Sequence, residues 1–145
     1  MMRILALDVG EKRIGVAISD PLGLTARGLV VLQRSSKEKD FAAIAALVQE
    51  HQAERVIVGY PLSLDGSAGP QAQRIAHYAE ALAQALEVPV ELWDERLSTV
   101  DAERVLRETG VSRRRRKQRV DAVAAAAILQ SYLEAHRNHS LEAGP

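Results

Sequence analysis

Four acidic residues occupy positions from which a folded chain could bring three carboxylates to one point. Asp8 ends an apolar run near the N-terminus, Asp94 and Glu95 end a second one, and Asp121 directly precedes an alanine-rich run. A carboxylate at the end of a buried strand is costly unless it is solvated, paired or bound to a cation. Three carboxylates in one cleft cannot all ionise comfortably without a cation. We therefore predict a metal site built from Asp8, Asp121 and either Asp94 or Glu95.

The expected ligands are carboxylate oxygens only. The chain has no cysteine, and its four histidines, at positions 51, 77, 136 and 139, stand in no metal-ligand pattern. Oxygen ligands without histidine or cysteine favour Mg²⁺ or Mn²⁺, which keep coordination positions open for phosphate oxygens. One or two such ions could activate water and stabilise the leaving oxygen of a phosphodiester. The chemistry expected of this site is therefore phosphodiester hydrolysis.

The elements that must position these acids form a β-β-β-α-β-α-β-α-α order. Apolar runs, turn residues and helix-start signals mark their approximate limits. We expect strands at residues 3–8, 13–19, 29–32, 55–58 and 88–93, and helices at about 35–51, 70–86, 98–110 and 119–136. The strand at 88–93 should lie at a sheet edge, because Pro89 cannot donate a ladder hydrogen bond.

This order predicts a mixed α/β sheet with an antiparallel hairpin side and a parallel side crossed by helices. Ligands of such sheets collect beyond the carboxyl ends of the strands, where Asp8 and the 94–95 pair fall. Asp121 shares a helix face with Ala124, Ala125 and Ile128. Their small side chains should let the last helix lie close to the sheet and bring Asp121 within reach of Asp8.

Basic residues are concentrated in one segment. Residues 113–119 hold six of the 19 basic residues and no acid. We expect a solvated loop that contacts the phosphates of a polyanionic substrate, with Lys12 and Arg96 flanking the acids in a similar role. Ser98 and Thr99, with Asp94 if Glu95 is the ligand, would support the metal ligands. The predicted nucleic-acid contacts are Lys12, Arg96, Arg113, Arg114, Arg115, Arg116 and Lys117.

Several other kinds of protein lack support in the sequence. The glycine spacing at 10–15 matches a P-loop, but Val16-Ala17 stands where Lys-Ser/Thr is required, and no Gly-x-Gly-x-x-Gly occurs. The N-terminal apolar run is too short for a signal peptide, and no run is long enough to span a bilayer. We expect a cytoplasmic protein with one domain, residues 1–136, and a flexible tail, residues 137–145.

Four ordered blocks of the sequence resemble the YqgF (RuvX) family of Holliday junction resolvases and nucleases that mature the 5′ end of pre-16S rRNA. The blocks are DVG with RIGVA from residue 8, G-x-PL with DG from residue 59, DERLST from residue 94, and Asp121 with Ala124, Ala125, Ile128 and Leu129. The resemblance covers residues 3–133; it departs at Tyr60, where the family more usually has leucine.

The resemblance implies a ribonuclease H-like fold, with a five-stranded sheet of order 3-2-1-4-5 and helices on both faces. It also implies that Asp8, Glu95 and Asp121 are the catalytic acids, which favours Glu95 over Asp94. The function we expect is metal-dependent hydrolysis of structured nucleic acid, in pre-16S rRNA 5′-end processing, Holliday junction resolution or both.

Two other functions are compatible with the same residues. One is a non-catalytic nucleic-acid binding module of the same fold. The other is an actin-like phosphotransferase, which would need a second domain to close over ATP. Phosphate contacts do not distinguish DNA from RNA unless a 2′-hydroxyl is read. Resolution of a symmetric junction would call for a two-fold homodimer.

Overall fold

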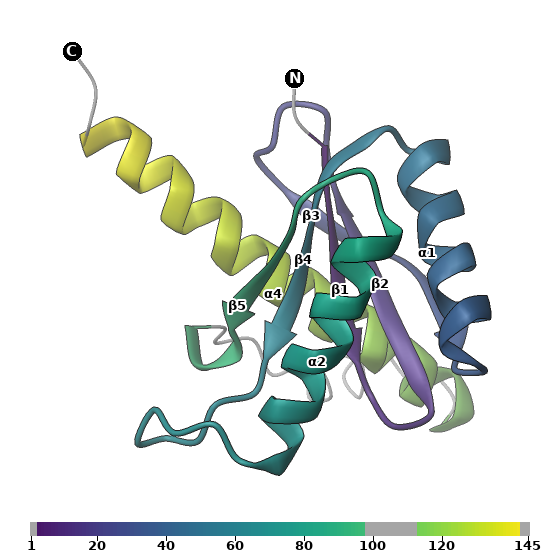
Figure 1. The fold of residues 1–145 in the computed structure, drawn as a ribbon. Helices are drawn as coiled ribbons and strands as arrows, with labels where there is room; N and C mark the ends of the chain where they lie inside the picture. Colours follow the sequence, from purple (N-terminus) through teal and green to yellow (C-terminus); the bar gives the residue numbers. More distant parts are fainter. Residues whose placement is uncertain (1–2, 98–112, 143–145) are drawn as a thin grey trace.

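Five strands form one mixed sheet in the order β3-β2-β1-β4-β5 (Figure 1). The computed structural model describes the backbone of residues 3–97 and 113–142 and the side chains of residues 3–96 and 121–136. The strands are β1 (Arg3–Val9), β2 (Arg13–Ser19), β3 (Ala26–Gln33), β4 (Ala53–Tyr60) and β5 (Val90–Asp94). The helices are α1 (Lys37–Glu50), α2 (Pro70–Ala85), the 3₁₀ turn η1 (Glu95–Leu97) and α4 (Arg113–Glu142).

The ribonuclease H-like strand order implied by the family resemblance is confirmed. Strand β1 pairs antiparallel with β2 and parallel with β4, and these neighbours pair in turn with the edge strands β3 and β5. The predicted edge position of β5 is also confirmed. Pro89, just before this strand, still contributes its carbonyl, which accepts a 2.9 Å hydrogen bond from the Val56 amide.

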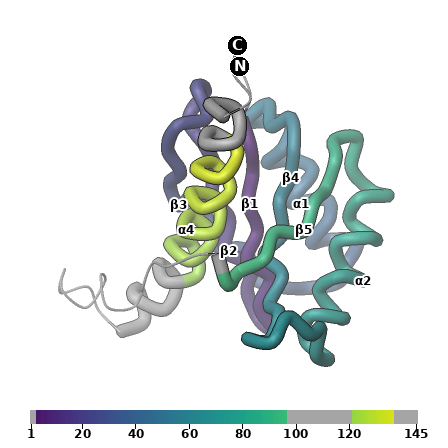
Figure 2. Tube along the Cα trace, turned by 90° about the vertical axis from the view of Figure 1, so that its left-hand side faces the viewer, coloured from purple at the N-terminus to yellow at the C-terminus, as the bar shows by residue number. Residues whose placement is uncertain are grey.

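The first two helices begin where the sequence provides start signals. Ser36 caps α1, because its side chain accepts a 3.1 Å hydrogen bond from the Lys39 amide. Helix α2 follows Gly69 and has Pro70 in its first turn, where the missing proline N–H costs nothing. Both helices pack on the same face of the sheet, as Figure 2 shows in an edge view.

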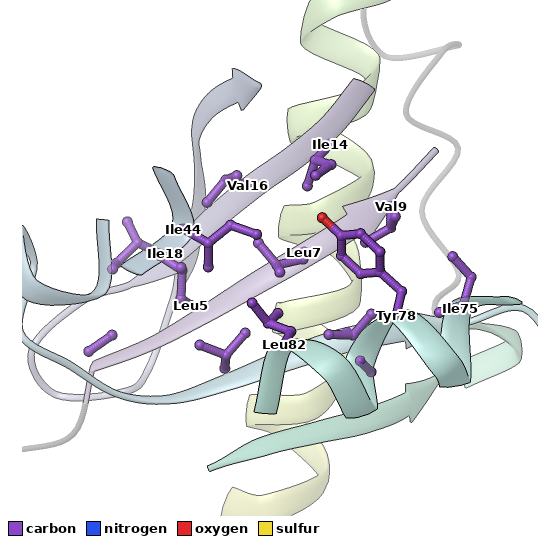
Figure 3. Close-up of a cluster of buried hydrophobic side chains, with 14 residues drawn as sticks. Leu5, Leu7, Val9, Ile14, Val16, Ile18, Ile44, Ile75, Tyr78 and Leu82 are labelled. Atoms are coloured by element: carbon purple, nitrogen blue, oxygen red, sulfur yellow. The ribbon is translucent and has the colours of Figure 1, made fainter. Parts of the chain in front are cut away.

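Alternation along β1 divides the interior into two cores. Leu5, Leu7 and Val9 face α1 and α2, where they pack with Tyr78 and Leu82 (Figure 3). The intervening residues Ile4 and Ala6 face α4 and pack with its residues Ala125, Ile128 and Leu129. Helices therefore cover both faces of the sheet, as expected. By the same alternation, Asp8 lies on the α4 face.

The prediction of a loop at residues 113–117 is wrong. The backbone there forms the first turns of α4, which begins at Arg113 and continues to Glu142, beyond the predicted limits of 119 and 136. A dense run of arginines cannot form a packed face, but arginine is a good helix former and can extend a helix into solvent. The predicted helix at 98–110 lies outside the described residues. Among those residues, no helix is long and apolar enough to cross a membrane.

Candidate active site

Asp8 occupies the central strand one residue before its end, with a glycine beside it on each neighbouring strand. In β2 its partner is Gly15. In β4, Gly59 comes one residue after Val58, the partner of Leu7. Asp8 is thus the side chain that projects from this row towards α4, between two positions that carry no side chain of their own.

Each glycine leaves room for one of the other predicted acids. A Cβ added at Gly15 would overlap the backbone carbonyl of Asp121 at the underside of α4. A Cβ at Gly59 would come within 2.5 Å of the Glu95 Oε1 atom. The approach of Asp121 and of Glu95 to Asp8 therefore depends on these two glycines.

Asp8 and Glu95 form a carboxyl pair joined by a side-chain hydrogen bond. Burial raises the pKa of Asp8 from 3.8 to about 6; the charge of Asp121 also raises it, while the hydrogen bond with Glu95 lowers it. Burial, followed by the charges of Asp8 and Asp94, raises the pKa of Glu95 from 4.5 to about 7. The two carboxyls therefore hold one proton between them in their hydrogen bond. Two carboxylates in contact cannot both ionise readily.

Asp121 approaches from the other side and forms an ion pair with Arg13. The Arg13 Nε atom donates a 2.8 Å hydrogen bond to Asp121 Oδ2, and both side chains are mostly shielded from solvent. Arg13 lies two residues before Gly15 and so shares its face of β2. This arginine was not among the residues predicted from the sequence, although alternation along β2 was a signal that could have placed it beside Asp121.

The carboxylate oxygens of Asp8, Glu95 and Asp121 suit a hard divalent cation, although they do not surround a single point in this structure. Within the described side chains, no three His, Cys, Asp or Glu residues form a cluster that could hold a metal ion. The proton of the Asp8–Glu95 pair and the Arg13 guanidinium satisfy these oxygens instead. Carboxylates must be deprotonated to bind a metal, so an ion entering this site must displace the shared proton.

Asp94 and Arg96 form an ion pair with each other. The Arg96 Nη2 atom lies 2.7 Å from Asp94 Oδ2, and this contact lowers the pKa of Asp94. Arg96 also donates through Nη1 to the carbonyls of Ser63 and Leu64 at 3.4 and 3.3 Å. The guanidinium thus ties the loop after β4 to the turn that carries Glu95.

The remaining predicted site residues divide between the hairpin turn and parts outside the described side chains. Lys12 is exposed in the turn that joins β1 and β2, at the same end of the sheet as Asp8. The arginine run stands in the first turns of α4, ahead of Asp121 on the same helix. Ser98 and Thr99 lie outside the described residues. The structure therefore places Asp121 and Glu95 on either side of Asp8, whereas the side chains of the arginine run lie outside the described ones.

The metal-free protein is expected to lose stability as the pH rises from about 5 to 8. The folded pKa values of about 6 and about 7 for Asp8 and Glu95 lie above the ordinary 3.8 and 4.5, so the folded state holds more protons in this interval. Their contribution is fully present below about pH 4 and is lost as the pH rises through 6 and 7. Asp20, Asp65 and Asp94 have lowered pKa values, so they titrate below this pH interval and do not affect the profile within it.

Thermal unfolding in EDTA at pH 5, 6, 7 and 8 measures this effect, and Glu95→Gln is the control that should flatten the profile. Added Mn²⁺ should raise Tm more at pH 8 than at pH 6, because the ion competes with the shared proton. A Tm in EDTA that stays level over this interval, or an equal effect of Mn²⁺ at both pH values, would contradict the proton-sharing arrangement.

Comparison with known proteins identifies the family of this chain. The family model described as RuvX, Holliday junction resolvase, matches residues 2–135. A protein of Myxococcus xanthus named "Putative pre-16S rRNA nuclease" is 54% identical over 136 residues, which cover 94% of this chain and 90% of the relative. A protein of the same name from Syntrophomonas wolfei is 51% identical over 133 residues, covering 92% and 94% of the two chains.

Solved structures with the same fold include two DNA-bound resolvases. Thermus thermophilus RuvC in complex with a Holliday junction substrate superposes with a TM-score of 0.61 at 18% identity, covering 95% of this chain and 97% of the other. The fowlpox virus resolvase complexed with Holliday junction DNA has a TM-score of 0.54 at 14% identity, covering 93% and 99%. At these identities the likeness shows the fold alone. The match of the family model, together with relatives of about half-identical sequence, shows that the chain belongs to the RuvX family of Holliday junction resolvases.

Proposed function

We propose that this chain is a metal-dependent nuclease that hydrolyses phosphodiester bonds in structured nucleic acid, with Asp8, Glu95 and Asp121 as its catalytic acids. The observation that carries the proposal is the convergence of these acids from three separate segments, across two glycines that leave room for it. Burial of two carboxyls is unfavourable, and side chains with pKa values raised in this way are typical of functional sites.

The three acids would hold one or two Mg²⁺ or Mn²⁺ ions. Bound ions of this type make water a stronger nucleophile and stabilise the leaving oxygen of an in-line attack on phosphorus. The chain's own residues supply the setting. The central strand fixes Asp8, the η1 turn presents Glu95, and Arg13 orients Asp121 through its 2.8 Å contact. Release of the proton that Asp8 and Glu95 share prepares the pair to bind a cation.

The proposed substrate is a polyanion, and basic residues adjoin two of the acids along the chain. Lys12 is exposed in the hairpin turn that follows Asp8, and the arginine run precedes Asp121 on α4. Such residues position the phosphate backbone without reading sequence. The relatives are named for pre-16S rRNA and two structural neighbours were solved with Holliday junctions, so these are the two substrate classes to test.

A direct cleavage assay tests the proposal and separates the two substrates. The protein would be incubated with Mg²⁺ or Mn²⁺ and either a four-way DNA junction or a precursor rRNA fragment carrying the immature 5′ end. Metal-dependent cleavage of one or both supports nuclease function, and preference identifies the substrate class. Preference for the junction would also predict a two-fold homodimer, because the junction itself is symmetric. Absence of cleavage of either substrate with both metals would count against the proposal.

Neutralising the arginine run is expected to weaken nucleic-acid binding and to reduce its salt dependence. Replacing Arg113, Arg114, Arg115, Arg116 and Lys117 with glutamine retains helix propensity and removes five charges. The slope of log K against log salt should fall by about 0.7 to 0.9 for each phosphate that the variant no longer neutralises. Binding titrations between 50 and 200 mM salt measure it, with circular dichroism as the control for helix content. An unchanged slope would remove this segment from the substrate-binding surface.

A further inference from the structure

A cavity lies on the face of the sheet opposite the carboxylates. Its volume is about 270 Å³, and it opens between the β1–β2 turn, the end of β3 and the first turns of α1 and α2. Val9, Ile75 and Tyr78 form its apolar wall; Figure 3 shows these three side chains together at one end of the core cluster. Asp8 precedes Val9 and points to the other face. The cavity is thus separated from the carboxylates by the sheet and joined to them by the turn at residues 10–12.

The polar lining of this cavity is predominantly basic. Arg34, Lys37 and Arg74 line it with His77, whereas Glu11 is the one acid in the lining. Within the described side chains, neither Lys37 nor Arg74 forms an ion pair with a carboxylate. Both are exposed, so their charges are available to a ligand.

Arg34 is the fixed member of the set. Its Nη1 atom donates a 2.8 Å hydrogen bond to the carbonyl of Gly10, and its guanidinium carbon lies 5.0 Å from the centre of the Tyr78 ring. Buried Asp40 stands 3.8 Å from its Nε atom and balances part of its charge. A guanidinium held on a backbone carbonyl and an aromatic ring loses little freedom when it binds an anion. The positive excess of the cavity therefore comes from Lys37 and Arg74 beside a preorganised arginine.

The size and walls of the cavity select among anions. Pockets for whole drug-sized ligands measure roughly 300 to 1,000 Å³, so this one suits a smaller group. Cationic side chains beside an apolar wall fit a phosphate that carries a sugar better than they fit a bare carboxylate. A nucleic-acid strand reaching the carboxylates on one face could pass over the exposed turn at Lys12 and present a neighbouring phosphate to the other.

We infer that this cavity binds a phosphate group of the nucleic-acid substrate through Arg34, Lys37 and Arg74, on the sheet face opposite the acids. The inference rests on the proposed function for the identity of its ligand. Either an internal backbone phosphate or a terminal 5′-phosphate has the required chemistry. The nucleic-acid strand would then be held at two points, at the acids on one face of the sheet and at this cavity on the other.

The double variant Lys37→Ala/Arg74→Ala tests the site, with Lys39→Ala as its matched control. Lys39 is exposed on the same helix as Lys37 but does not line the cavity. The probe is a single-stranded RNA prepared with and without a 5′-phosphate, titrated in EDTA so that no cleavage occurs. The double variant should bind about tenfold more weakly, the effect of losing one or two charge-assisted hydrogen bonds, and the control should not change.

The two forms of the RNA distinguish the source of the phosphate. A loss confined to the phosphorylated RNA identifies a terminal phosphate, and an equal loss for both identifies an internal one. Unchanged affinity of the double variant, or an equal loss in Lys39→Ala, would overturn the inference. Because binding is measured without metal, this result is independent of cleavage. A wild-type protein that binds through the cavity but never cleaves would contradict the proposed nuclease function and leave the phosphate site standing.

Discussion

Asp8→Asn is expected to reduce metal-dependent cleavage by more than about 100-fold while leaving nucleic-acid binding almost unchanged. Loss of residues that merely support a metal ligand already costs about 10- to 100-fold, and Asp8 is the acid on which the other two converge. Asparagine has nearly the same shape and can still accept the hydrogen bond from Glu95. The change therefore removes a charge without opening a cavity. Affinity should stay within about threefold, because the phosphate contacts come from basic side chains.

Cleavage rates with Mg²⁺ or Mn²⁺ and binding titrations in EDTA measure the two halves of this prediction. Asp20→Asn is the matched control, because Asp20 lies away from the site and its Oδ1 atom only accepts hydrogen bonds from the amides of Leu24 and Thr25. Asparagine can accept both. The control should retain both cleavage and binding.

The same variant separates the nuclease from a binding module of the same fold. A protein that only binds nucleic acid has no use for an ionised Asp8, so the substitution would change nothing measurable. Wild-type cleavage by Asp8→Asn would show that the proposed metal site is wrong, even if the protein proved to be a nuclease.

Gly15→Ala is expected to damage both the stability and the activity of the protein. The added Cβ would overlap the Asp121 carbonyl, so α4 must move away from β2. Alanine in place of glycine would by itself stabilise a strand by about 0.5–1 kcal/mol. Overpacking at a rigid contact costs about 1–3 kcal/mol or more, and here the obstacle is backbone rather than a flexible side chain. We therefore expect the cost of the overlap to exceed the gain in strand stability.

Thermal unfolding and cleavage assays measure the two consequences. We expect Tm to fall by about 4–12 °C. Cleavage should fall by about 100-fold, since a misplacement of about 1 Å at a catalytic centre can have that effect. Gly69→Ala is the control: nothing lies within 4 Å of the point that an added Cβ would occupy, and its φ of −73° suits alanine. Removing this cap should cost no more than about 1 kcal/mol and leave cleavage intact. If Gly15→Ala matched this control in both measurements, the close approach of α4 would not be needed.

Sequence patterns located the framework of the site well because they depend on local physics. The run ending at Asp8, the edge position of β5 and the capped starts of α1 and α2 follow from alternation, proline chemistry and capping. The small residue Ala125 correctly indicated that α4 lies close to the sheet. Local pattern could not choose between Asp94 and Glu95. In the structure Asp94 pairs with Arg96, and Glu95 hydrogen-bonds Asp8.

The parts that sequence did not reveal are contacts between distant segments. Gly15 and Gly59 were visible as turn or strand-end residues, but their role is to let the backbone of α4 and the side chain of Glu95 come close to the sheet. Arg13 is separated from Asp121 by more than a hundred positions; alternation along β2 places it on the face of Gly15 but does not by itself identify its partner. The arginine run was misassigned because its charge excludes burial, whereas burial is not required for a helix that continues from a packed segment.

The two cores on opposite faces of the sheet do not stabilise the positions of the three acids equally. Asp8 belongs to a strand that both cores hold, whereas Asp121 is carried by a helix anchored in one of them. Cooperative units of a protein can open separately from the rest. An opening that releases α4 would break up the acid cluster while α1, α2 and the core beneath them stayed folded. The proposed catalytic centre thus depends on the contact between α4 and the sheet, and global unfolding measurements alone would underestimate how easily that centre is lost.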